Sequence, residues 1–94
     1  MENGNRLLTE ATNAAIRACL QKLKVDGIEA SNADLIPLIQ VKVSEAIPQA
    51  MKDLREAHAC GMDQIAVMTF LASMCLAGVA AAIQYESELK EINA

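Results

Sequence analysis

Residues 65–83 read IAVMTFLASMCLAGVAAAI, a run of 19 residues without a charged side chain. A helix that is hydrophobic on every side is either buried on every side or placed in a membrane. The run is long enough for both environments, because about 20 apolar residues suffice to cross a bilayer. The rest of the chain must therefore be arranged around this segment.

The composition and the flanks of the run argue against a membrane span, which we keep as an alternative. Six of its residues are alanine, and its seven strongly apolar side chains contribute only about −3 kcal/mol to membrane insertion. Acidic residues lie on both sides, with Asp63 before the run and Glu86 after it. No excess of lysine or arginine sets an orientation. We therefore interpret the run as the central helix of a soluble bundle.

Small residues recur in the run at a spacing of four, which lets a neighbouring helix approach closely. Two short helices from the same chain cannot cover the whole circumference of the run, and an uncovered apolar stripe is an association surface. The sequence therefore predicts a dimer or a higher homo-oligomer. The residues expected at this self-association contact are Met68, Leu71, Ser73, Cys75, Ala77, Gly78, Val79, Ala81 and Ala82.

Two further helices are expected, at residues 6–24 and 34–59, and the apolar run belongs to a third helix at residues 63–91. Hydrophobic residues spaced by three and four give the first helix a wide apolar face. Asp26-Gly27 is expected to end that helix. The expected fold is an all-α, three-helix antiparallel bundle in a single domain of residues 1–94, with a long apolar third helix.

The second helix contains Pro48, and we expect a kink near residues 44–48 because proline removes one backbone hydrogen bond. Residues 39–43 read IQVKV and alternate with the period of a strand. A short strand is therefore the competing interpretation, although no second strand pairs with it. Gly61 is expected to close the second helix in a short turn, which makes the second and third helices antiparallel neighbours.

The charge and the cysteines restrict the function and the compartment. The net charge of −4 and the isoelectric point of about 4.8 leave no basic face for nucleic acid. The three cysteines are an odd number and match no disulfide framework. The first residues, MENGNRLL, lack a basic region followed by an apolar stretch. We therefore expect a cytoplasmic protein that does not bind nucleic acid.

Residues 58–63, HACGMD, form the one cluster of metal-ligand side chains in the sequence. A zinc site takes three or four ligands, so a site at His58 and Cys60 needs a second subunit to complete it. A metal-responsive oligomer that uses His58 and Cys60 is kept as a second alternative to an oligomer without metal. No nucleophile with its base, phosphate loop or cofactor motif is present. We expect no catalytic residues, no cofactor and no resident metal, and thus no enzyme.

The expected function is that of a small, non-enzymatic helical protein that acts by binding. Its first partner is a second copy of itself, and another protein or a small apolar ligand between the helices is a further candidate. In size and class the chain resembles small helical accessory proteins of phages, mobile elements and secretion assemblies. That resemblance implies a class of protein and assigns no role to any residue.

Overall fold

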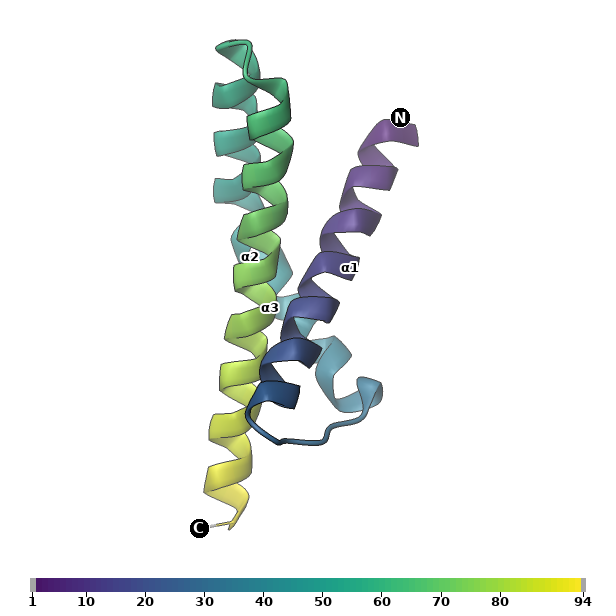
Figure 1. The fold of residues 1–94 in the computed structure, drawn as a ribbon, viewed down its shortest axis with the longest axis vertical. Coiled ribbons are helices and arrows are strands. Elements are labelled where there is room, and N and C mark those ends of the chain that lie inside the picture. The colour runs from purple at the N-terminus through teal and green to yellow at the C-terminus, as the bar shows by residue number, and fades with distance from the viewer. Residues whose placement is uncertain (1, 94) are drawn as a thin grey trace.

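The computed structural model describes residues 2–93, with side chains from residue 6 to residue 92. The three helices are α1 (Glu2–Val25), α2 (Asn32–Ala59) and α3 (Asp63–Asn93) (Figure 1). No strand occurs among these residues, and residues 39–43 are helical. The all-α, three-helix bundle expected from the sequence is confirmed.

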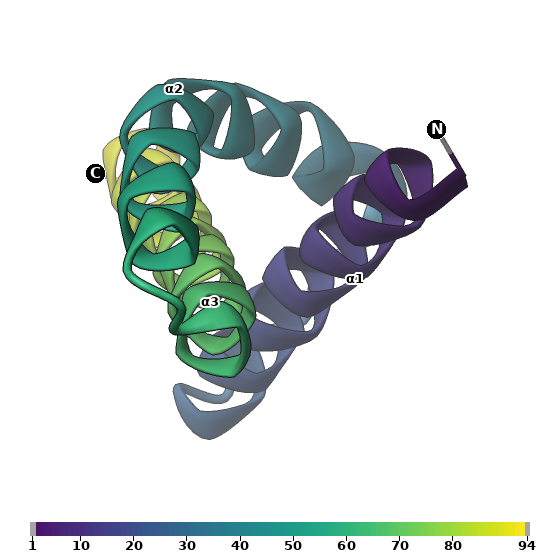
Figure 2. The same cartoon turned by 90° about the horizontal axis from the view of Figure 1, so that it is seen from above.

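The central element of the fold is α3, because α1 and α2 both pack along it and contact each other little. The molecule is 50 Å long and 21 Å across. α2 and α3 run antiparallel and side by side as a hairpin, as the sequence predicts (Figures 1 and 2). α1 crosses α3 obliquely, so its N-terminal part diverges from the hairpin (Figure 1).

Glycines end α1 and α2 in the same way. Gly27 and Gly61 have φ angles of 71° and 76°, which glycine adopts without steric cost. The amide after each glycine donates to a carbonyl five residues back, at 2.9 Å after Gly27 and at 3.0 Å after Gly61. These are Schellman turns. They confirm the helix ends predicted at Asp26-Gly27 and at Gly61.

Two helices begin earlier than the sequence predicts. α1 begins at Glu2, since nothing in residues 2–5 stops a helix and Gly4 costs only about 1 kcal/mol. α2 begins at Asn32, because the Ser31 hydroxyl accepts a hydrogen bond from the backbone N–H of Asp34 at 3.3 Å. This side-chain bond caps the new helix.

α2 is one continuous helix although it contains Pro37 and Pro48. Each proline removes one N–H from the ladder of backbone hydrogen bonds, so the helix bends where those bonds are missing. The bend separates a first half that lies near α1 from a second half that follows α3 (Figures 1 and 2). The kinked second helix expected from the sequence is thus present.

The core contains few bulky side chains. Phe70 and Met74 of α3 are 1% and 0% exposed. They pack in a cluster with aliphatic residues of the other two helices and with many alanines. The largest completely buried side chains besides these two are Leu23, Leu35, Ile39 and Cys19.

α1 approaches α3 very closely at Ala15 and Gly78. A Cβ atom placed on Gly78 would overlap the carbonyl oxygen of Ala15 and would lie 2.8 Å from its carbonyl carbon. The backbone of α1 therefore rests directly on α3, and only glycine fits at residue 78. Ala81 and Ala82 are completely buried as well.

We predict that Gly78→Ala destabilises the protein by about 1–3 kcal/mol, because the added methyl group must push α1 away from α3. At an open helical position the same change would stabilise the protein by about 1 kcal/mol, since alanine is the better helix former. The sign of the change in urea-induced unfolding, followed by circular dichroism, therefore tests the contact.

Ser87→Ala, at an exposed position of α3, is the matched control. It should change the free energy of unfolding by less than about 0.5 kcal/mol. A Gly78→Ala protein that is more stable than the parent would contradict the direct contact between the two backbones.

Candidate interaction surface

One face of α3 is apolar and points away from α1 and α2. Ile65, Leu76 and Ile83 are 56%, 70% and 53% exposed. They belong to a row whose members alternate at spacings of four and three residues, which places them on one side of a helix. The buried residues of α3 lie on the opposite side of the helix, about half a turn away from this row. We name this row the outer stripe, and it consists of Ile65, Thr69, Ala72, Leu76, Val79 and Ile83.

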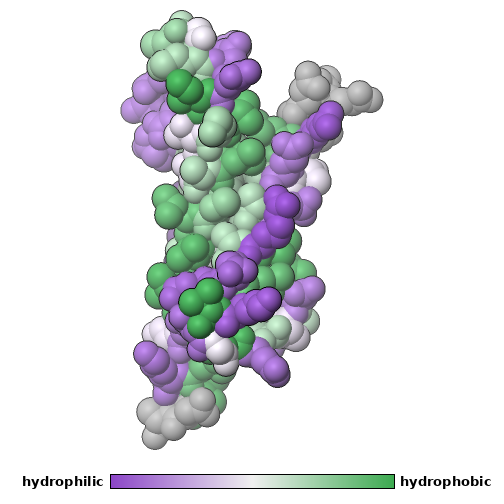
Figure 3. All heavy atoms as spheres, viewed as in Figure 1, coloured by the Kyte–Doolittle hydropathy of each residue, from purple (hydrophilic) through white to green (hydrophobic). Residues whose placement is uncertain are grey.

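The outer stripe carries no charge over its whole length, which is about 27 Å at the rise of an α-helix. Figure 3 shows hydrophobic side chains gathered along α3, with hydrophilic side chains on both sides. Met68 flanks the stripe and is 70% exposed. A continuous apolar patch of this kind marks a site of interaction with protein or lipid.

The residues that the sequence places at a self-association contact divide between two sides of α3. Four are buried within the chain itself: Ala77, Gly78, Ala81 and Ala82. Four are partly buried: Leu71, Ser73, Cys75 and Val79. Met68 is exposed. The four buried residues have no surface free for a second copy unless α1 or α2 moves away.

The residues predicted from the sequence do not include the most exposed large side chains of the stripe, which are Ile65, Leu76 and Ile83. The predicted set combines small residues spaced by four with larger residues such as Met68 and Leu71, and α1 of the same chain covers the small residues at Gly78. The spacing alone could not have found the outer stripe, because the run is uncharged on every side and the same alternation of four and three residues can be traced along its other faces.

α3 is also the one helix among residues 2–93 that is long and apolar enough to cross a membrane, over Asp63–Ile92. In the fold, 39% of its most apolar window is buried against the rest of the chain. The core helix of a soluble bundle has the same length and composition. These two properties therefore fit a bundle and a membrane span alike.

A hollow of about 500 Å³ lies where α1 diverges from the α2–α3 hairpin. All three helices contribute to its lining, with aliphatic side chains and three ionisable ones. The lining residues are Leu7, Leu54, Arg55, His58, Asp63, Ala66 and Val67. The hollow is a recess with an apolar part and a charged part.

His58 joins the end of α2 to the start of α3. Its Nδ1 atom lies 2.6 Å from Oδ1 of Asp63, and both side chains are mostly exposed. Cys60, the other residue of the predicted metal cluster, is exposed on the turn. Within residues 2–93 no three His, Cys, Asp or Glu side chains come together to hold a metal ion. One copy of the chain thus offers a pair of side chains here and no third ligand.

The cysteines differ in their surroundings, although all three are unpaired. Burial raises the pKa of the Cys19 thiol. Cys75 is partly buried, with its Sγ atom 4.0 Å from the carbonyl oxygen of Ala14. Because a reactive thiol needs a lowered pKa and access to solvent, Cys19 behaves as a small core residue.

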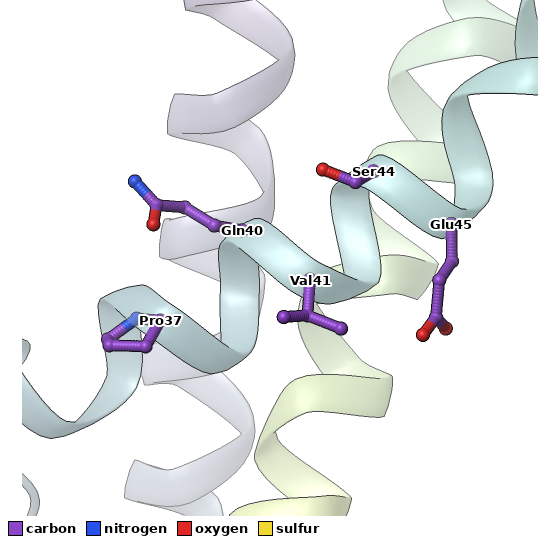
Figure 4. A pocket seen from close by; sticks show the side chains of 5 residues that line it. All are labelled: Pro37, Gln40, Val41, Ser44 and Glu45. Carbon is purple, nitrogen blue, oxygen red and sulfur yellow. The ribbon is translucent and has the colours of Figure 1, made fainter.

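A second hollow, of about 530 Å³, is lined by residues of α2 alone. Figure 4 shows its five side chains, which leave the helix in different directions and do not converge on a common point. The residues are Pro37, Gln40, Val41, Ser44 and Glu45. Such a shallow surface offers no set of groups that could act together on a ligand.

Two carboxyl groups meet where the C-terminal end of α1 lies beside α3. A hydrogen bond with Glu86 and one from Lys22 lower the pKa of Asp26. The Lys22 Nζ atom is 2.6 Å from Oδ2 of Asp26. The pKa of Glu86 is raised, first by the hydrogen bond with Asp26 and then by desolvation. The opposite shifts mean that Glu86 binds a proton more readily than Asp26 does.

The two shifts have opposite consequences for stability. The raised pKa of Glu86 stabilises the fold below the ordinary carboxyl value of about 4.3, and this stabilisation is lost as the pH rises through the raised pKa. The lowered pKa of Asp26 stabilises the fold above about 3.9, and this stabilisation is lost only as the pH falls through the lowered pKa. At neutral pH two carboxylates lie together here, with the charges of Lys22 and Lys90 acting on Glu86.

We predict that Glu86→Gln raises the melting temperature at pH 7, because the amide can donate to Asp26 without adding a charge. The gain should shrink towards pH 4, where Glu86 of the parent protein is protonated. Thermal melts between pH 4 and pH 7 measure the difference. Glu91→Gln, which removes the same charge from an exposed position, should give a smaller change, and equal gains for both variants would contradict the pairing.

Comparison with protein-family models, with curated proteins and with solved structures finds no match to this chain. The comparisons therefore assign no role to any residue of α3 or of the two hollows.

Proposed function

We propose that this chain is a small, non-enzymatic helical protein that acts by binding a second copy of itself through the outer stripe of α3. The observation that supports the proposal is the uncharged face of about 27 Å, on which Leu76 is 70% exposed. Full burial of one such aliphatic side chain contributes about 1.5–3 kcal/mol. Contact between two copies would remove several of them from water at once.

The other features of the surface support a binding protein more than a catalyst. The strongest side-chain clusters are the contact of His58 with Asp63 and the contact of Lys22, Asp26 and Glu86. Each cluster joins two helices or a helix and its turn, and neither combines a nucleophile with a base. We extend the proposal to a cytoplasmic location, for which the three unpaired cysteines are the supporting observation.

We predict that the parent protein has a native mass above 10.1 kDa and that Leu76→Glu returns it to the monomer mass. A carboxylate in the middle of the stripe would lose its hydration in a contact between copies, which is unfavourable. Size-exclusion chromatography with light scattering gives the mass, and circular dichroism shows whether the helices are kept.

Val41→Glu is the matched control, because Val41 is a large aliphatic residue of α2 with 52% of its surface exposed. It lies outside the stripe and should leave the native mass unchanged. A parent protein that is monomeric at high micromolar concentration would exclude self-association.

A single-pass membrane protein is a second candidate, because α3 has the length and composition of a span. In a bilayer the outer stripe would face lipid. α1 and α2 would then have to leave α3, which would uncover Leu23, Leu35 and Ile39, now 1–2% exposed, or enter the membrane with their charged side chains, which is costly. This loss of core is the physical reason for placing self-association first.

The two candidates predict different behaviour during purification. A self-associating bundle should remain in the supernatant after centrifugation of lysed cells at high speed without detergent. A membrane protein should sediment with the membranes and dissolve only when detergent is added. If the protein is recovered only after detergent is added, the membrane protein replaces the self-associating bundle as the first candidate.

A further inference from the structure

We infer that two copies of the chain pair through their α3 helices in antiparallel orientation, about a two-fold axis level with Met74. The inference rests on the proposed self-association and adds the orientation and the register of the contact. It follows from the order of large and small residues along the outer stripe.

The stripe has the spacing of a coiled-coil seam. Its members follow one another at intervals of four, three, four, three and four residues, which is the seven-residue repeat of helices that wind around each other. The sequence of intervals is the same from either end, and its midpoint is residue 74. A helix with this pattern can therefore lie against a reversed copy of itself with every stripe residue in contact.

In the antiparallel register each stripe residue lies level with a different residue of the second copy. Leu76 meets Ala72, Val79 meets Thr69, and Ile83 meets Ile65. The largest residue near the centre thus faces the smallest, so the distance between the two helix axes can stay nearly constant over residues 69–79, and it is greater only at the two end layers of Ile65 and Ile83. Large residues opposite small ones give the interlocking that dense packing requires.

A parallel register places each residue against its own copy. Leu76 then meets Leu76 while Ala72 meets Ala72, which leaves a gap one turn away from a crowded layer.

The outer stripe also bears on the strength of the contact. Its length of about 27 Å and the helix diameter of about 10 Å give a narrow strip of surface. Contacts smaller than the standard interface of about 800 Å² per partner belong to weak or transient complexes. The dimer is thus concentration-dependent, and it forms and dissociates reversibly.

Disulfide trapping tests the register. The background is Cys60→Ser, because Cys60 is the exposed native cysteine. Ala72→Cys and Leu76→Cys are prepared separately, one of them with a tag that changes its mass, and are oxidised mildly alone and as a mixture. Val41→Cys is the control, since it places an exposed cysteine outside the stripe. Circular dichroism shows that each variant is folded.

The antiparallel register predicts that the mixed disulfide between residues 72 and 76 forms several-fold faster than either homotypic disulfide. A disulfide needs Cβ atoms about 3.5–4.5 Å apart. In the antiparallel register, residue 76 of one copy lies four residues, or about 6 Å along the helix axis, from residue 76 of the other copy, and the same holds for residue 72. Homotypic disulfides that form faster than the mixed one would overturn the antiparallel register and leave self-association intact.

Disulfide formation no faster than in the Val41→Cys control would overturn the pairing of α3 helices. If light scattering then also gave 10.1 kDa at every concentration, the proposed function would fail with it. Binding of such a monomer to phosphatidylcholine vesicles would identify lipid as the occupant of the outer stripe.

Discussion

The structure depends on one constraint, which is that α3 is hydrophobic around its whole circumference while two helices cover only part of it. The covered side is made of small residues, and there α1 approaches so closely that the Ala15 backbone touches Gly78. The uncovered side carries large residues such as Leu76. Both the packing of the core and the proposed self-association follow from this division of one helix into two faces.

Much of the fold could be predicted from local chemistry. Glycine at the two helix ends, hydrophobic spacings of three and four, and a proline within α2 each act through a few neighbouring residues, so the sequence displays them directly. The predicted helix starts were less accurate. Ser31 caps α2 through one hydrogen bond, and neighbouring residues that could also cap a helix made the start ambiguous in the sequence. Residues 39–43 alternated like a strand, but they had no strand to pair with and became helical in contact with the core.

The candidate site could be predicted only in part. Small residues spaced by four predict a close helix contact, but they do not specify which helix makes it. The answer depends on how α1 crosses α3, and thus on packing between residues far apart in the chain, such as Ala15 and Gly78. Once α1 occupies that side, Leu76 and its neighbours form the remaining surface, and a residue's hydrophobicity alone does not reveal this.

The oblique crossing of α1 divides that helix into a part with a buried inward side and a more exposed part before Ala11. From Ala11 to Leu23 its inward side is buried, whereas Leu8, one turn earlier, is 45% exposed. Tertiary contacts contribute most of the stability of a helix in water, and in the turn before Ala11 the side chain of Leu7 is only partly buried against the core. Amide hydrogens there should exchange with solvent long before those at the crossing, and unfolding should begin at this end.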